Sequence, residues 1–125
     1  MSQEHPNIEV LKRFDPRDPV VLSEDVIFHF FNPLLPDLNG DYVGREGVSA
    51  FFAKLQTITG ESFEPHVVSI QAIGDELVVV HRKQAINLDD RKVESDVVVV
   101  WRIVDGQIKE VWDIPSVHNV HCVTE

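Results

Sequence analysis

The chain has little of what disulfide-rich, secreted or membrane proteins need. Cys122 is the only cysteine, so no internal disulfide can form, which fits a reducing compartment. Residues 1–6 show no basic segment followed by an apolar run, the pattern of a secretory signal peptide. No apolar run approaches the length that spans a bilayer. We therefore expect a cytoplasmic protein.

Basic residues are also scarce. There are 11 Lys and Arg against 21 Asp and Glu, a formal net charge of −10. Such a surface repels phosphate backbones and anionic lipids, so we expect no nucleic-acid and no membrane partner. The chain also lacks glycine-rich phosphate loops, a Gly-x-Ser-x-Gly elbow and a Cys-x-x-Cys pair, which disfavours nucleotide chemistry and serine or cysteine hydrolysis.

Apolar side chains are plentiful and follow recognisable periods. With 125 residues, of which 43% are hydrophobic, the chain suits one domain, taken as residues 1–125. Apolar residues three or four apart predict a short helix over 7–14 and a longer one over 45–59, whose apolar stripe comprises Val48, Phe51, Phe52, Leu55 and Ile58. Prolines and glycines predict a loop over 32–44.

The remainder is predicted to be strand. One strand is expected at 26–31, and four more at 66–73, 76–88, 92–104 and 107–114. Gly74-Asp75, Asp89-Asp90 and Asp105-Gly106 are tight turns, so the strands that they join should be antiparallel neighbours. The pattern indicates an α+β fold with an antiparallel sheet.

The run from Val97 to Trp101 is apolar at both alternating positions. A strand of this kind is covered on both faces. The helices can cover only one face of the sheet. We therefore expect a second copy of the chain on the other face, which predicts a homodimer.

Several segments resemble one known family. They are Asp25–His29, Gly40–Val48 with Phe51-Phe52, Gly74–Arg82, and the hairpin Trp101–Asp113. Their order and spacing over residues 7–115 are similar to those of SnoaL-like proteins in the nuclear-transport-factor-2-like (NTF2-like) superfamily. The resemblance implies a cone in which a strongly curved sheet wraps around the helices and encloses a pocket. It also implies dimers formed through the outer sheet face.

The family has members with different activities, so fold does not fix function. Its polyketide cyclases use an aspartate for proton transfer without metal or cofactor. Its ketosteroid isomerases need an Asp base, a Tyr and a protonated Asp. The corresponding positions here are 30–32 for the base, 7–14 for the Tyr and Val99 for the protonated Asp, and none of these residues occurs there. We therefore exclude steroid isomerisation by that mechanism.

A limonene-epoxide-hydrolase mechanism would need an Asp-Arg-Asp set that holds a water molecule. Asp113 and Asp96 with Arg82 or Arg102 are the available residues. Asp96 and Arg102 have the alternation expected of the outer face of the sheet. This mechanism is therefore disfavoured.

Asp113 is the first candidate for catalysis. On the final strand it shares a face with Val111, and the family alignment turns that face inward, so Trp112 and Glu110 should point outward. A carboxyl group beside an apolar pocket has a raised pKa because burial disfavours its charge. That is what a general acid or base near neutral pH needs. The structural alternative is that Asp113 accepts hydrogen bonds from a loop or pairs with Arg45.

His29 is the second candidate. It follows Val26-Ile27-Phe28 on the first strand, and a buried imidazole needs a partner. We expect it to face the pocket and to form a dyad with Asp113, in which the carboxylate tunes the imidazole. The alternative is a core histidine that bonds to a backbone carbonyl.

Four more residues are candidates for ligand contact. Phe52 and Trp101 are expected to be pocket walls. His81 is expected to line the same pocket. The alternative is that it lies at the solvent-exposed end of the sheet. Tyr42 could hydrogen-bond a ligand or pack its own loop.

His118, His121 and Cys122 form a His-x-x-His-Cys cluster that could hold a divalent metal. The cluster lies near the chain end, and no carboxylate motif accompanies it. We therefore expect no bound metal and no organic cofactor.

Two functional hypotheses remain. In the first, the pocket binds a small hydrophobic molecule, and Asp113 and His29 carry out cofactor-independent acid–base catalysis of the polyketide cyclase or isomerase type. In the second, the same pocket belongs to a non-catalytic small-ligand binding module.

Overall fold

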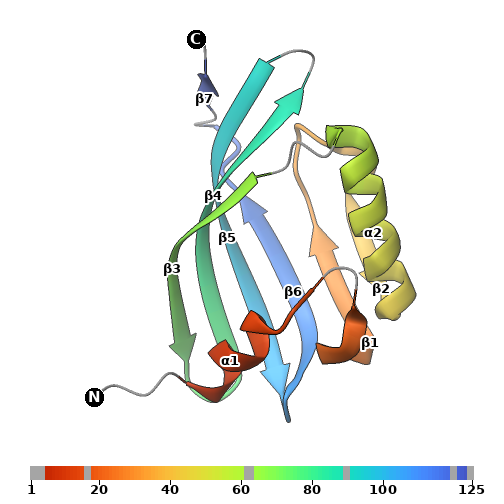
Figure 1. Ribbon diagram of the computed structural model, residues 1–125, viewed down its shortest axis with the longest axis vertical. Helices are drawn as coiled ribbons and strands as arrows, with labels where there is room; N and C mark the ends of the chain where they lie inside the picture. The colour runs from red at the N-terminus through yellow and green to blue at the C-terminus, as the bar shows by residue number, and fades with distance from the viewer. Residues whose placement is uncertain (1–4, 16–17, 61–63, 89–90, 119–120, 124–125) are drawn as a thin grey trace.

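The computed structural model describes residues 5–15, 18–60, 64–88, 91–118 and 121–123. Its elements, labelled in Figure 1, are two helices, α1 (Pro6–Lys12) and α2 (Gly44–Thr59), and the strands β1 (Leu22–Phe30), β2 (Gly40–Val43), β3 (Glu64–Ile73), β4 (Leu77–Leu88), β5 (Arg91–Val104), β6 (Gln107–Pro115) and β7 (His121–Val123). Short 3₁₀ turns lie at Pro19–Val21 and Pro36–Leu38. Both predicted helices and all five predicted strands are present, with shifted ends.

All the main strands form one sheet in the order β2-β1-β6-β5-β4-β3, and β7 pairs with β5. The β3–β6 meander is antiparallel, as the tight turns predicted. The sheet is nevertheless mixed, because β1 and β6 run parallel. The expectation of a wholly antiparallel sheet was wrong here, since β1 and β6 are joined by a long connection and no hairpin fixes their direction.

Two strands were not predicted. β2 lies inside the segment expected to be a loop and pairs antiparallel with β1. β7 lies in the tail, where Cys122 is opposite Val93. Strands of three or four residues are too short to show an alternating apolar pattern, so the sequence alone gave no signal for them.

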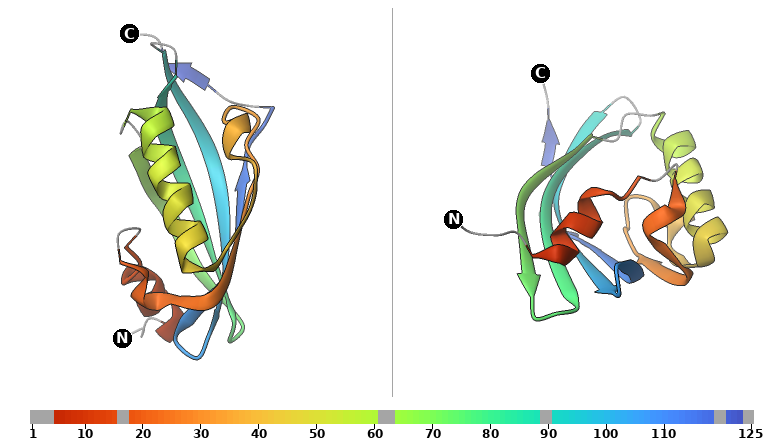
Figure 2. Two further views of the ribbon diagram at one scale, coloured as in Figure 1. Left: turned by 90° about the vertical axis from the view of Figure 1, so that its right-hand side faces the viewer. Right: turned by 60° about the horizontal axis from the view of Figure 1, so that its bottom comes forward.

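Helix α2 lies on the concave side of the curved sheet, and α1 lies across the same side near one end (Figure 2). The buried residues Val48, Phe51 and Leu55 of α2 face the sheet. Ile58, which was expected on that stripe, is 37% exposed. The helix ends at Gly60, whose left-handed backbone (φ 61°) suits glycine.

Alternation along β5 and β6 separates two sheet faces. Val97, Val99 and Trp101 are buried on the concave face, whereas Val98 and Val100 lie on the outer face. The hairpin turn between the strands has two residues with positive φ, Asp105 (51°) and Gly106 (78°), as two-residue Asp-Gly turns require. The register set by the turn shifts by one residue between Arg102 and Ile103, and this irregularity places Asp113 opposite Val99.

Within the described residues, no helix combines the length and the apolar character needed to cross a membrane.

Candidate ligand-binding and catalytic site

A small internal cavity lies between α2 and the concave face of the sheet. Its volume is about 30 Å³, which is room for about two water molecules. It is lined by residues of β1, α2, β4, β5, β6 and the loop after β1, namely Phe28, Phe30, Leu35, Phe51, Phe52, Leu55, Arg82, Gln84, Val99, Trp101 and Asp113. A ring-sized ligand would therefore have to displace side chains as it enters.

Asp113 reaches this cavity from β6, and only 9% of the residue is exposed. Burial raises the pKa of its carboxyl group to about 6, although the positive charge of Arg82 acts in the opposite direction. The two side chains form an ion pair in which Arg82 Nη2 lies 3.4 Å from Asp113 Oδ2. A carboxyl group that titrates close to neutral pH can both accept and donate a proton.

The buried side-chain atoms at the cavity include three that have no hydrogen-bond partner among the residues that the structure describes. They are Gln84 Oε1, Trp101 Nε1 and Asp113 Oδ1. Buried polar groups are normally paired, so these atoms are candidates for hydrogen bonds to water or to a ligand. These atoms converge from three neighbouring strands, β4, β5 and β6, and give the cavity one polar side.

The opposite side of the cavity is aromatic. Phe28 lies 4.7 Å from Phe51 between ring centroids, and Phe51 lies 5.0 Å from Phe52. Phe14, directly after α1, packs against both Phe52 and Trp101, at 5.8 and 5.4 Å. Phe52 and Trp101 thus lie on the cavity wall, the position expected for them.

His29 does not lie in this cavity. The parallel register of β1 and β6 pairs Phe30 with Asp113 and His29 with Trp112, so His29 and Asp113 point to opposite faces of the sheet. The expected dyad was wrong because Phe28 and Phe30 point into the cavity, so alternation along β1 places His29, which lies between them, on the outer face.

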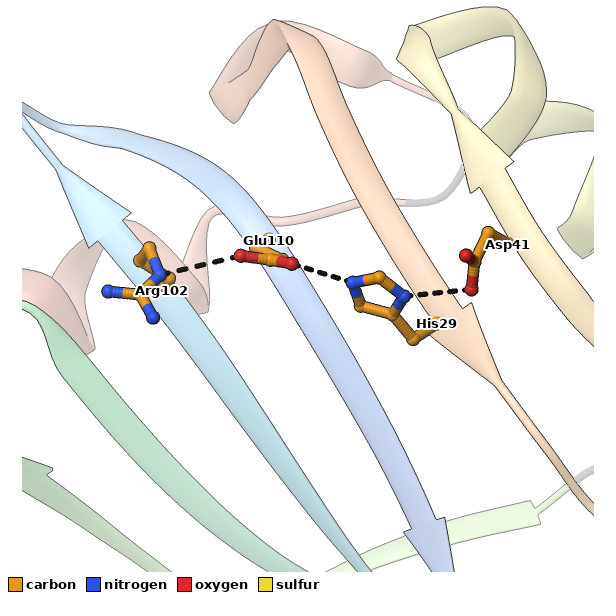
Figure 3. Close-up of polar contacts among 4 residues, drawn as sticks. All are labelled: His29, Asp41, Arg102 and Glu110. Atoms are coloured by element: carbon orange, nitrogen blue, oxygen red, sulfur yellow. Dashed lines mark hydrogen bonds and ion pairs between the residues drawn. The ribbon is translucent and has the colours of Figure 1, made fainter.

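On the outer face His29 joins a row of charged residues (Figure 3). Its Nδ1 lies 2.8 Å from Asp41 Oδ1 and its Nε2 lies 2.6 Å from Glu110 Oε2. Partial burial alone would lower the pKa of His29, but its hydrogen bonds to Glu110 and Asp41 outweigh that effect and raise it. His29 and Asp113 both border a shallow groove of about 350 Å³ at the strand ends, but Phe52 and Trp101 do not.

The other two candidates also lie away from the cavity. His81 is on the outer face, where its Nε2 lies 2.9 Å from Asp96 Oδ1. The Tyr42 hydroxyl donates a hydrogen bond to the Leu38 carbonyl at 2.6 Å, and its ring packs on Phe51. Tyr42 therefore has the loop-packing role that was its alternative.

The partner of Asp113 is Arg82 and not Arg45, whose Nε donates to the Leu22 carbonyl at 2.9 Å. The sequence suggests Arg82 only as part of an epoxide-hydrolase set, and Gln84 is not among the predicted site residues. A signal for both was present, because Arg82 and Gln84 continue the inward alternation of Val78 and Val80 on β4.

The Asp-Arg-Asp set is not assembled. Asp96 bonds to His81 on the outer face, and Arg102 pairs there with Glu76 at 2.6 Å and with Glu110 at 3.5 Å. The cavity holds only one carboxylate of that set, Asp113.

Among the described residues, no group of three or more His, Cys, Asp or Glu side chains is placed to hold a metal ion. Of the His-x-x-His-Cys cluster near the chain end, the side chains of His121 and Cys122 lie outside the described part of the chain.

The SnoaL-like domain family matches residues 12–111, and the chain belongs to this family. No curated protein sequence is significantly similar to the chain.

Solved structures share the fold. Bal32a, from a soil-derived mobile gene cassette, has a TM-score of 0.76 at 16% identity, with 88% of each chain covered. An NTF2-like protein of unknown function from Burkholderia pseudomallei has a TM-score of 0.74 at 24% identity, with 90% of each chain covered. TerC, co-crystallised with polyporic acid, has a TM-score of 0.73 at 24% identity, covering 89% of this chain and 92% of TerC. At these identities the likeness establishes the fold alone.

Proposed function

We propose that the cavity beside Asp113 binds a small, mainly apolar molecule and that Asp113 exchanges a proton with it. The observation that supports this proposal is a titratable carboxyl group, with a pKa of about 6, set in a mainly apolar cavity. Membership in the SnoaL-like family, and a solved relative crystallised with polyporic acid, agree with small-molecule binding. His29 has no part in the proposal, because it lies on the other face.

The proton transfer would use only groups of this chain. In its ionised form Asp113 Oδ1 accepts a proton from an acidic C–H or O–H of the ligand, and in its protonated form it returns one. Arg82 remains paired with Oδ2 and limits the rise of the pKa of Asp113. The Trp101 indole N–H is available to donate a hydrogen bond to an oxygen on which negative charge develops.

Binding in the cavity can be tested with two neighbouring residues of β5. Val99 lines the cavity opposite Asp113, whereas Val98 faces outward. Val99→Phe should fill the cavity and abolish binding of acetophenone, and Val98→Phe should leave it unchanged. Both changes are made in a Trp112→Phe background, in which Trp101 is the only tryptophan and its fluorescence reports the ligand. Equal binding by both variants would contradict the proposed location, provided that circular dichroism shows both to be folded.

Acid–base catalysis can be tested without knowing the natural substrate. A benzyl ketone in D₂O should exchange its acidic methylene hydrogens faster when the protein is present. Asp113→Asn preserves the shape of the side chain and removes the proton carrier, so the exchange rate should fall by about 10²-fold or more. Binding without any acceleration of exchange would favour the second candidate function, a non-catalytic binding module. The cavity volume of only about 30 Å³ and the ion pair of Asp113 are also compatible with such a module.

We further propose that the chain forms a homodimer through the outer sheet face. There Val98 is 36% exposed and lies opposite Ile114, which is 54% exposed, next to the half-buried Trp112. Ile114→Glu should shift the protein to monomer in sedimentation equilibrium at micromolar concentration. Val67→Glu, at an equally exposed site on β3, is the matched control and should leave the dimer intact. A monomeric wild-type protein would contradict the proposal. The expected cytoplasmic location stays a prediction.

A further inference from the structure

We propose that the ligand of this cavity is an uncharged single-ring molecule that carries a carbonyl oxygen and a hydroxyl or N–H group. This inference rests on the proposed binding function and specifies the chemical class of the ligand. It is drawn from the charges at the cavity, from its three polar atoms without partners, and from their arrangement on one side.

The charges at the cavity disfavour an ionic ligand. Of the residues that line it, Asp113 and Arg82 are the ionisable ones, and they are paired with each other. A carboxylate ligand would meet the negative charge of Asp113, and a cation would compete with Arg82 for it. A neutral molecule leaves this pair intact.

The polar atoms define the hydrogen bonds that a ligand must make. An indole N–H can only donate, so Trp101 Nε1 calls for an acceptor such as a carbonyl oxygen. The free oxygens of Gln84 and Asp113 call for a donor such as a hydroxyl or an N–H group. A purely apolar ligand would leave all three atoms buried and unpaired, which weakens its binding.

The two sides of the cavity set the orientation of the ring. Trp101, Gln84 and Asp113 lie on adjacent strands of the sheet, so the oxygen-bearing edge of the ligand should face the sheet. The other side is formed by side chains of α2, including Phe51, Phe52 and Leu55, and suits the apolar part of the ring. With a volume of only about 30 Å³, the cavity must widen even for one ring. Phe52, which is only half-buried, is the wall residue best placed to move.

The test compares five single-ring probes: para-hydroxyacetophenone, acetophenone, phenol, ethylbenzene and para-hydroxybenzoate. Affinities are measured by NMR from the methyl signals of Val99 and Leu55, which line the cavity. The hydroxyacetophenone should bind at least about tenfold more tightly than ethylbenzene, since each net hydrogen bond adds roughly fivefold to tenfold. Acetophenone and phenol should fall between them, and the anionic hydroxybenzoate should bind most weakly.

Two variants connect this preference to named atoms. Trp101→Phe keeps an aromatic wall and removes the donor, so it should weaken hydroxyacetophenone binding by about fivefold to tenfold and leave ethylbenzene unchanged. Gln84→Leu should do the same for the probes that carry a hydroxyl group. Trp112→Phe, which changes the tryptophan of the outer face, is the matched control and should alter no affinity.

The possible outcomes separate this inference from the proposed function. If ethylbenzene binds as tightly as hydroxyacetophenone, or hydroxybenzoate binds most tightly, the ligand class is wrong although the cavity binds ligands. The same conclusion follows if Trp101→Phe, shown to be folded by circular dichroism, leaves the order of affinities unchanged. If none of the five probes binds, the proposed binding function itself is contradicted.

Discussion

The carboxyl group of Asp113 combines deep burial with one cationic neighbour. Burial favours the neutral acid and Arg82 favours the carboxylate, and burial is the larger effect. The result is a pKa of about 6, against an ordinary value of 3.8. Neither contribution could be known from the sequence, because both depend on which side chains share the cavity.

This raised pKa has a consequence for stability. Between its ordinary pKa and about 6, Asp113 binds a proton in the folded protein but not in the unfolded chain. Its contribution to stability is therefore fully present below the unfolded pKa and is lost as the pH rises through about 6. The amide side chain of the Asp113→Asn variant does not titrate. The free energy of unfolding of the wild type, relative to this variant, should fall by about 2–3 kcal/mol from about pH 4 to about pH 8. Urea denaturation at a series of pH values measures it, and a constant difference would contradict the assigned burial.

Arg82 should act in the opposite direction from burial. Arg82→Met keeps much of the side-chain volume and removes the positive charge, so the pKa of Asp113 should rise above its wild-type value of about 6. A ¹³C NMR titration of the carboxyl carbon measures this shift. Lys83→Met, one residue along β4 and exposed, is the control and should change the pKa little. A lower pKa in the Arg82 variant would show that the two groups do not interact as described.

On the outer face of the sheet, a row of charged residues connects four neighbouring strands. Asp41 of β2, His29 of β1, Glu110 of β6 and Arg102 of β5 follow one another across the sheet (Figure 3). The ring of Trp112 stacks on His29 at 5.5 Å, and Arg102 lies 5.3 Å over the same ring. With a carboxylate at each nitrogen, His29 is best satisfied when it is doubly protonated.

The pH dependence of this row has a definite sign. The pKa of His29 is raised in the folded protein, so its stabilisation is fully present below the unfolded pKa and is lost as the pH rises through the folded pKa. His29→Gln should therefore reduce the free energy of unfolding at mildly acidic pH by on the order of 1 kcal/mol, a small value because Asp41 is largely exposed. The loss should become smaller at alkaline pH. His66→Gln, at an exposed site on β3, is the control in the same thermal-denaturation series. A loss that grows with pH would contradict this assignment.

Sequence periodicity predicted the inner and outer faces of single strands well. On β6 the alternation from Val111 predicts Asp113 inward and Trp112 outward, whereas a register shift beside Arg102 interrupts it nearer the Asp105-Gly106 turn. His29 is the exception: it lies between the inward Phe28 and Phe30 and therefore faces outward. The parallel pairing of β1 with β6, which joins residues about eighty positions apart, could not be predicted from such alternation. Local patterns specify a hairpin, but a long-range register depends on the packing of the whole sheet.

For the molecule as a whole, the order of helices and strands along the sequence was enough to predict the fold and the family. A SnoaL-like domain over residues 12–111 and an α2 helix inside the curved sheet agree with that expectation. The content of the cavity was harder to predict. Phe52, Trp101 and Asp113 were expected there, whereas Gln84 was not, and His29, His81 and Tyr42 lie elsewhere. A cavity is defined by the way in which separate elements meet, which residue type and spacing do not specify.

The central claim is that Asp113 is a ligand-facing acid with a pKa near neutrality. A ¹³C NMR titration of its carboxyl carbon, with and without para-hydroxyacetophenone, tests this claim directly. The predicted result is a midpoint at about pH 6 in the free protein that moves when the probe is bound. A midpoint near the ordinary 3.8, or one that does not move when the probe saturates the protein, would contradict the claim.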